Sequence, residues 1–305
     1  GGPDSLALLL ALKLLAVKEK INIGCCCVNH HLRAAAGKEA EFVESVCREW
    51  NIPFILKEVD VQSAVRNGGS IETAARDLRY KALREAARGG RYAKIAVAHH
   101  GDDQAETVLY HLLRGSGVTG LSGMKPINGD IIRPFLCVSK NEIKDFLKDF
   151  SYVPCHDESN DVEDAVRNRI RLSLVPELIS YNPRVTESLR RTADIFREED
   201  LFMEEKADVF ISSCVEHDND KCVFFIAYFL ALHIALQRRV IRKICCMVAG
   251  RIPSFEGIEK FIFLIDAGKT GSVTSSSGTF LEIQYGKAIF YKGSTQNRIP
   301  AGKLK

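Results

Sequence analysis

Residues Lys94–Thr107 read KIAVAHHGDDQAET, and this stretch decides the fold. Its first part, Lys94–Ala98, predicts a strand. The acids that follow predict the first turn of a helix over Asp102–Arg114, because the helix dipole favours negative charge there. Ligands of open parallel sheets bind at the carboxyl ends of the strands. The polar residues at this junction therefore mark a candidate site.

The same alternation of helix and strand runs through the first 150 residues. Further helices are expected at Leu6–Lys18, Lys38–Trp50, Ser70–Arg88 and Ser139–Phe150, and strands at Ile21–Val28, Phe54–Val59 and Ile131–Ile132. Ser139 and Glu142 have the spacing of a capping box. Alternation of this kind predicts an α/β fold with a doubly wound parallel sheet.

After Asn160 the pattern changes to helices, followed by short strands. Helices are expected at Glu163–Leu174, Arg184–Ser213, Val223–Ala249 and Ser254–Ala267, and strands at Ser272–Thr274, Thr279–Gln284 and Ala288–Tyr291. We therefore expect a catalytic domain over residues 1–183, a helical connector over 184–216 and a smaller α+β domain over 217–305.

The composition is that of a globular protein, with 46% apolar and 27% charged residues among 305. A net charge of +3 neither requires nor excludes nucleic acid. The longest apolar stretches, Leu6–Val17 and Cys222–Leu236, are too short or too interrupted to span a bilayer, so no membrane partner is expected. The ten cysteines include no Cys-x-x-Cys pair, which argues against a zinc ribbon and fits a reducing cytoplasm.

The first candidate site is the start of the chain, Gly1, Gly2, Pro3, Asp4 and Ser5, directly before a helix. Two glycines let the backbone approach a ligand closely, and a helix N-terminus favours anions. Together they would hold a pyrophosphate. Read alone, these five residues are more typical of an ordinary flexible terminus.

The second candidate site is the acid pair that follows the strand predicted at Lys94–Ala98. Asp103 and Glu106 are three residues apart and share one helix face, where two carboxylates can hold an ammonium group or a magnesium ion. His100 directly precedes them, and His30 follows the strand Ile21–Val28 at the same sheet edge. A capped, solvated helix start is the alternative interpretation.

Basic and glycine-rich segments supply further candidates. Arg76 and Arg79 lie in a stripe with Tyr80, and arginines also cluster within residues 167–191 and 238–243. Such clusters are typical of nucleic-acid binding, although each alone also fits a solvated helix face. The loop with Gly115 and Gly117 follows the acid-bearing helix and could equally be a C-cap and turn.

Taken together, these segments resemble the tRNA(Ile)-lysidine synthetase family of N-type ATP pyrophosphatases, the PP-loop superfamily. Gly1–Ser5 is similar to the family's pyrophosphate loop. The other matching segments, in order over roughly Gly1–Pro176, are Asn29–Arg33, Ala75–Tyr80, Ala98–Thr107, Arg114–Gly117, Gly120–Met124, Ile132–Pro134, Asp157–Asn160 and Arg167–Arg169. The series is specific, whereas any one segment is not.

The resemblance implies an ATP-dependent ligase that forms a C–N bond. ATP activates the wobble cytidine of a CAU-anticodon tRNA(Ile) at its C2 oxygen and releases pyrophosphate. The amine of free L-lysine then attacks C2 and displaces AMP. The implied cofactors are ATP and Mg²⁺, and a homodimer is left open.

The resemblance also implies roles for individual residues. The N–H groups of Gly1–Ser5 would stabilise the pyrophosphate, Asp4 would help to hold magnesium, and Asp103 and Glu106 would bind the ammonium of lysine. That ammonium must lose a proton before it attacks, and His100 is the candidate acceptor. The candidates for contacting ATP, tRNA phosphates or the lysine carboxylate are His30, Arg33, Arg76, Arg79, Gly115, Gly117, Arg133, Arg167, Arg169 and Arg171.

One departure from the family pattern affects the expected sheet. The first serine of the loop and the strand before it are missing, so we expect that this chain lacks its true N-terminus. Three alternatives remain open: a tRNA thiolase on the same fold, a small-molecule enzyme such as NAD or GMP synthetase, and a catalytically impaired tRNA-binding fragment. The missing Cys-x-x-Cys pair disfavours the first.

Overall fold

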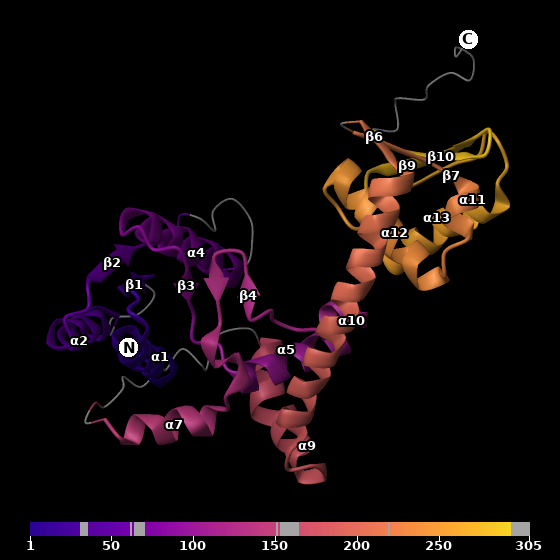
Figure 1. The fold of residues 1–305 in the computed structure, drawn as a ribbon. Coiled ribbons are helices and arrows are strands. Elements are labelled where there is room, and N and C mark those ends of the chain that lie inside the picture. The colour runs from indigo at the N-terminus through magenta and orange to yellow at the C-terminus, as the bar shows by residue number, and fades with distance from the viewer. Residues whose placement is uncertain are drawn as a thin grey trace. The chain divides into compact units, whose positions relative to one another are not determined.

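The computed structural model describes residues 1–30, 36–61, 63, 71–150, 152, 165–218 and 220–293 (Figure 1). The chain divides into two compact units, Gly1–Arg197 and Glu198–Lys305. None of the helices described is both long and apolar enough to cross a membrane.

The strands of unit 1 pair in two small sheets. β1 (Cys25–Asn29) runs parallel to β2 (Phe54–Glu58), and β3 (Ile95–Ala96) runs parallel to β5 (Ile131–Ile132). β4 (Ile127–Asn128) adds an antiparallel edge to β5. The predicted α/β class with parallel strands is confirmed, but among the described residues the strands form two sheets instead of one.

The helices of unit 1 follow the sequence pattern closely. They are α1 (Pro3–Glu19), α2 (Ala36–Glu49), α4 (Ile71–Gly89), α5 (Gly101–Leu113), α6 (Val118–Leu121), the 3₁₀ turn η1 (Pro134–Cys137), α7 (Lys140–Lys148), α8 (Ala165–Arg169), the π-helical turn η3 (Ile170–Leu174), α9 (Val175–Tyr181) and α10 (Val185–Cys214), which continues into unit 2. The predicted capping box of α7 is confirmed, because Glu142 accepts from the Ser139 backbone N–H at 2.7 Å.

Apolar faces hold these elements together. α1 packs on α7 through a cluster that includes Leu6, Leu10 and Ile143. α4 packs against β1, β2 and β3, so one helix covers strands of both sheets (Figure 1). Tyr80 and Leu83 of α4 contribute to the cluster around β3 and β5.

Unit 2 contains a five-stranded antiparallel sheet in the order β6-β7-β10-β9-β8. Its elements are β6 (Glu216–Asp218), β7 (Lys221–Phe225), α11 (Ile226–Leu230), α12 (Ile234–Ala249), α13 (Phe255–Ala267), β8 (Val273–Ser276), β9 (Thr279–Gln284) and β10 (Lys287–Lys292). The prediction of one helix over Val223–Ala249 was wrong at its start. Cys222 and Phe224 alternate with more exposed neighbours and face the core from a strand.

Candidate active site

The central feature of unit 1 is the start of α5. His100 is the N-cap: its Nδ1 accepts the Asp103 backbone N–H at 3.4 Å, and the Asp103 carboxylate accepts the His100 backbone N–H at 2.9 Å. A Cβ on Gly101 would lie 2.9 Å from the carbonyl oxygen of Val138, so only glycine fits without a shift. The reciprocal cap fixes the directions of both side chains.

The first turn of α1 meets this cap. The Nε2 atom of His100 lies 3.7 Å from Oδ2 of Asp4 and 3.5 Å from Oδ2 of Asp103. His100 itself is buried, with 4% of its surface exposed. The structure therefore brings Asp4 of the predicted pyrophosphate loop and Asp103 of the predicted acid pair to the same nitrogen of one imidazole ring.

Asp4 is a carboxylate with a raised pKa and one buried oxygen without a hydrogen-bond partner among the described residues. Burial raises its pKa above the ordinary aspartate value, with Asp103 adding to the rise while His100, Lys140 and Arg171 oppose it. Its Oδ1 atom is buried and accepts no hydrogen bond from the described residues. An unsatisfied buried carboxylate oxygen of this kind fits a cation ligand.

The fit to magnesium rests on that single carboxylate. Within the described ranges no three histidine, cysteine, aspartate or glutamate side chains form a metal-binding group. Mg²⁺ commonly takes only one or two protein carboxylates and completes its shell with phosphate oxygens and water. Asp4 therefore fits a magnesium ion that arrives with a nucleotide.

Asp103 and Glu106 share the inner face of α5, as predicted, and Arg171 of η3 lies against both. Its Nε and Nη2 atoms donate to the two Glu106 oxygens at 2.7 and 2.9 Å, and Nη2 also donates to Asp103 at 3.3 Å. These bonds raise the pKa of Arg171 above its already high value. Two carboxylates and one guanidinium leave one net negative charge.

The neighbouring arginines occupy different settings. Arg167 donates to the Thr107 hydroxyl at 3.4 Å and lies over the Tyr110 ring, whereas Arg169 is exposed. Arg133 is 7% exposed and donates through Nη1 to the Lys125 carbonyl oxygen at 2.7 Å.

His99 is a site residue that the sequence reasoning passed over. Burial lowers its pKa to about 4, with Arg133, Arg79 and Arg76 adding to the fall and Asp103 opposing it. The imidazole is therefore neutral at physiological pH. Its place beside His100, just after the strand predicted at Lys94–Ala98, was the available signal.

His30 lies at the end of β1, where burial and Arg79 lower its pKa. Arg79 also lowers the pKa of His99. One guanidinium therefore acts on both His30 and His99. Arg33 and the segment Asp157–Asn160 lie outside the described residues.

The glycines have identifiable local roles. Gly2 is the N-cap of α1, with Pro3 as the first helical residue, and its carbonyl oxygen accepts the Leu6 N–H at 3.1 Å. Gly115 has a φ of +71° just after α5, which an L side chain rarely adopts, and Gly117 is the N-cap of α6.

The second basic cluster, for which nucleic-acid binding and a solvated helix face were both left open, forms ion pairs within unit 2. Arg238 pairs with Glu259 at 2.8 Å, and Arg239 bonds to Asp200 at 2.6 Å. Lys243 pairs with Glu204 at 2.7 Å. These charges of α12 are largely neutralised inside unit 2.

Comparisons with known proteins identify the family of this chain. Residues 1–178 match the model of the PP-loop domain family. The chain is 34% identical over 304 residues to the tRNA(Ile)-lysidine synthase of Caldanaerobacter subterraneus, covering 98% of this chain and 65% of that protein. It is 33% identical over 298 residues to the Thermotoga maritima tRNA(Ile)-lysidine synthase, covering 96% and 70%.

The chain belongs to the tRNA(Ile)-lysidine synthase family. This synthase-family chain spans about two thirds of the length of those relatives. Among solved structures, a U34-tRNA thiolase from Methanococcus maripaludis is similar with a TM-score of 0.51 and 18% identity, over 65% of this chain and 70% of the thiolase. At that identity the likeness supports the PP-loop fold alone.

Proposed function

We propose that this chain catalyses ATP-dependent ligation of free L-lysine to C2 of the wobble cytidine in a CAU-anticodon tRNA(Ile). The observation that carries the proposal is the meeting of Asp4 with Asp103 at the His100 ring, within 3.7 Å. This contact supports a site in which the start of α1 would bind ATP and the acid pair Asp103 and Glu106 would bind the lysine ammonium, close enough for the two substrates to react.

In the first step the C2 oxygen of the cytidine attacks the α-phosphorus of ATP, and pyrophosphate leaves. The backbone N–H groups of Gly2, Asp4 and Ser5 at the start of α1 would stabilise the charge on that leaving group. Asp4 would hold the magnesium ion, which when bound neutralises phosphate charge.

In the second step the lysine amine attacks C2 and AMP leaves. The residual negative charge of Asp103 and Glu106 beside Arg171 would hold the substrate's ammonium. Because the ammonium has a pKa of about 10.4, it must first give up a proton. His100 remains our candidate acceptor, because its Nε2 atom lies 3.5 Å from Asp103 and 3.7 Å from Asp4, between the two proposed substrate sites.

The test incubates the chain with ATP, lysine and a CAU-anticodon tRNA(Ile) transcript, followed by nucleoside mass spectrometry for cytidine plus lysine minus water. Asp103→Asn should lose the product, because it removes one carboxylate of the pair. Asp145→Asn is the matched control, since Asp145 is 70% exposed and pairs only with Lys148 on α7. Full yield from Asp103→Asn would remove the lysine-site assignment.

A second candidate, the catalytically impaired tRNA-binding protein, predicts another outcome in the same assay. It predicts that the transcript binds while neither pyrophosphate nor AMP is released. A thiolase would modify the transcript without taking up lysine. Location in the cytoplasm and a homodimer remain predictions.

We also propose that the two small sheets of unit 1 belong to one doubly wound sheet. The helix α4 packs against β1 and β2 of the first sheet and against β3 of the second, so one helix covers both.

A further inference from the structure

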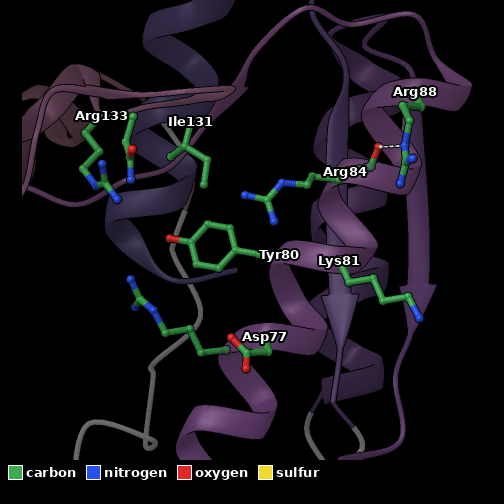
Figure 2. A pocket seen from close by; sticks show the side chains of 9 residues that line it. Asp77, Tyr80, Lys81, Arg84, Arg88, Ile131 and Arg133 are labelled. Carbon is green, nitrogen blue, oxygen red and sulfur yellow. Dashed lines mark hydrogen bonds between the residues drawn. The ribbon is translucent and has the colours of Figure 1, made fainter. Parts of the chain in front are cut away.

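A basic trough lies beside the site, on the α4 side of β5 (Figure 2). It has a volume of about 510 Å³, and five of its nine lining residues are arginine or lysine while one is acidic. That volume is within the roughly 300–1,000 Å³ typical of ligand pockets. The excess of positive charge specifies an anionic ligand.

An aromatic ring lies at the centre of this trough. Figure 2 shows Tyr80 with the side chains of Arg84 and Arg133 directed toward it. The guanidinium carbons of Arg76 and Arg84 lie 5.2 and 5.9 Å from the ring centroid. Aromatic rings interleaved with arginines are the combination that binds single-stranded nucleic acid, the ring by stacking on a base and the cations by contacting phosphates.

Arg133 gives an independent indication of a ligand. It is more than nine-tenths buried, and its Nε atom is buried without a hydrogen-bond partner in the described part of the chain. No carboxylate pairs with it there, whereas Arg84 is paired with Asp130 at 2.8 Å. A buried guanidinium without a counter-ion is costly unless an anion completes it.

The extent of the positive charge favours RNA over a mononucleotide. Basic side chains continue along α4 from Arg76 to Arg88, twelve residues or about 18 Å of helix. A mononucleotide bound at the start of α1 would not need cations over that length. Arg76 and Arg133 at the near end also act electrostatically on His99 of the site.

We propose that this trough binds the nucleotide adjacent to the reacting cytidine in the tRNA, with its base stacked on Tyr80 and its phosphate on Arg133 and Arg76. The inference rests on the proposed function for the identity of the RNA. It assigns Tyr80 as a binding residue that positions the anticodon loop.

The test measures the affinity of the full chain for an anticodon stem-loop RNA by fluorescence anisotropy, and for ATP by equilibrium dialysis. Tyr80→Leu keeps an apolar side chain against the β3–β5 cluster but removes the π face. We expect about a tenfold or greater loss of RNA affinity, little change for ATP, and near-normal RNA affinity for Tyr80→Phe. Arg76→Ala should lower the slope of log K against log salt by about one.

Two controls sharpen the result. Arg48→Ala removes an arginine that is 80% exposed on α2, outside the trough, and should change RNA affinity much less than Arg76→Ala. Two further stem-loops each lack one base, either 5′ or 3′ of the cytidine. The RNA that lacks the stacked base should bind wild type and Tyr80→Leu with equal affinity, which identifies that base.

Unchanged RNA affinity in both Tyr80→Leu and Arg76→Ala overturns the inference, as does a loss of ATP affinity without a loss for RNA. If Tyr80→Leu fails to fold, Arg76→Ala decides, because Arg76 is exposed. RNA binding that depends on these residues in a chain that makes no lysidine would contradict the proposed function alone. Lysidine formation with full RNA affinity in both variants would contradict this inference alone.

Discussion

Each unit of the molecule contains an arginine bonded to two carboxylates, and the two triads differ in burial. Arg171 of unit 1 has a 31% exposed side chain and contacts Glu106 and Asp103. Arg239 of unit 2 has a 9% exposed side chain and contacts Asp200 and Glu204, and the side chain of Asp200 is only 5% exposed.

The difference in burial assigns different roles to the two arginine–carboxylate triads. The triad of unit 1 lies near Asp4, since Asp103 and Asp4 both approach Nε2 of His100 and Asp4 has a carboxylate oxygen without a partner among the described residues, so a ligand can join it. The triad of unit 2 links α10 to α12 and is completed by Lys243. We therefore expect the first to control binding and the second to control stability.

The largest expected effect is on the stability of unit 2. Arg239→Met should lower the free energy of unfolding by about 3–5 kcal/mol, because it leaves the buried carboxylate of Asp200 without a counter-charge. Chemical denaturation followed by circular dichroism measures the change. The double variant Arg239→Met/Asp200→Leu should recover part of the loss, and a loss below 1 kcal/mol would break the comparison.

The second effect is on activity in unit 1. Arg171→Met should reduce lysidine formation by ten- to a hundredfold, since Glu106 and Asp103 lose the group that orients them. Its cost in stability should be smaller than that of Arg239→Met, because the side chains of Arg171 and Asp103 are 31% and 21% exposed and only Glu106 is buried. Comparing both variants in both assays checks this, and equal stability losses would contradict the division of roles.

The sequence predicted unit 1 better than unit 2 for a physical reason. Helix starts such as Ser139 with Glu142 are local, since a cap needs only neighbours in the chain. β7 was missed because its apolar residues continue directly into α11, and only pairing with β10 and β6 fixes Lys221–Phe225 as a strand. Long-range pairing is not written in a local pattern.

The site shows the same limit. The spacing of Asp103 and Glu106 predicted their common face on α5. Nothing local revealed that Arg171, 65 residues beyond Glu106, lies against both, or that Glu259 and Asp200 neutralise Arg238 and Arg239. Counting arginines along the chain overestimated the charge of α12 for that reason.

The third effect is a pH dependence confined to unit 1. Below its ordinary pKa of about 6.5, His99 is protonated in the unfolded chain, whereas the folded chain holds it neutral down to about pH 4. The unfolded state binds more protons, so stability falls as the pH drops from 6.5 to 4. Between pH 7 and pH 5 the free energy of unfolding of wild type should fall by about 2 kcal/mol or less relative to that of His99→Gln. Parallel stability curves for the two proteins in denaturant titrations between pH 7 and 5 would contradict this.

The smallest expected effect concerns RNA binding by the paired charges of unit 2. Arg238→Ala should change the affinity for the tRNA transcript less than twofold, because Glu259 already offsets this guanidinium at 2.8 Å and the pair is about 40% exposed. Arg76→Ala removes the same charge from a residue without an ion pair among the described side chains, so anisotropy titrations at two salt concentrations compare the two directly. If Arg238→Ala lowered the RNA affinity and the salt slope as much as Arg76→Ala, the ion pair with Glu259 would not prevent Arg238 from attracting RNA. The contrast between an open unit 1 and an internally balanced unit 2 would then fail at the residue where it is easiest to measure.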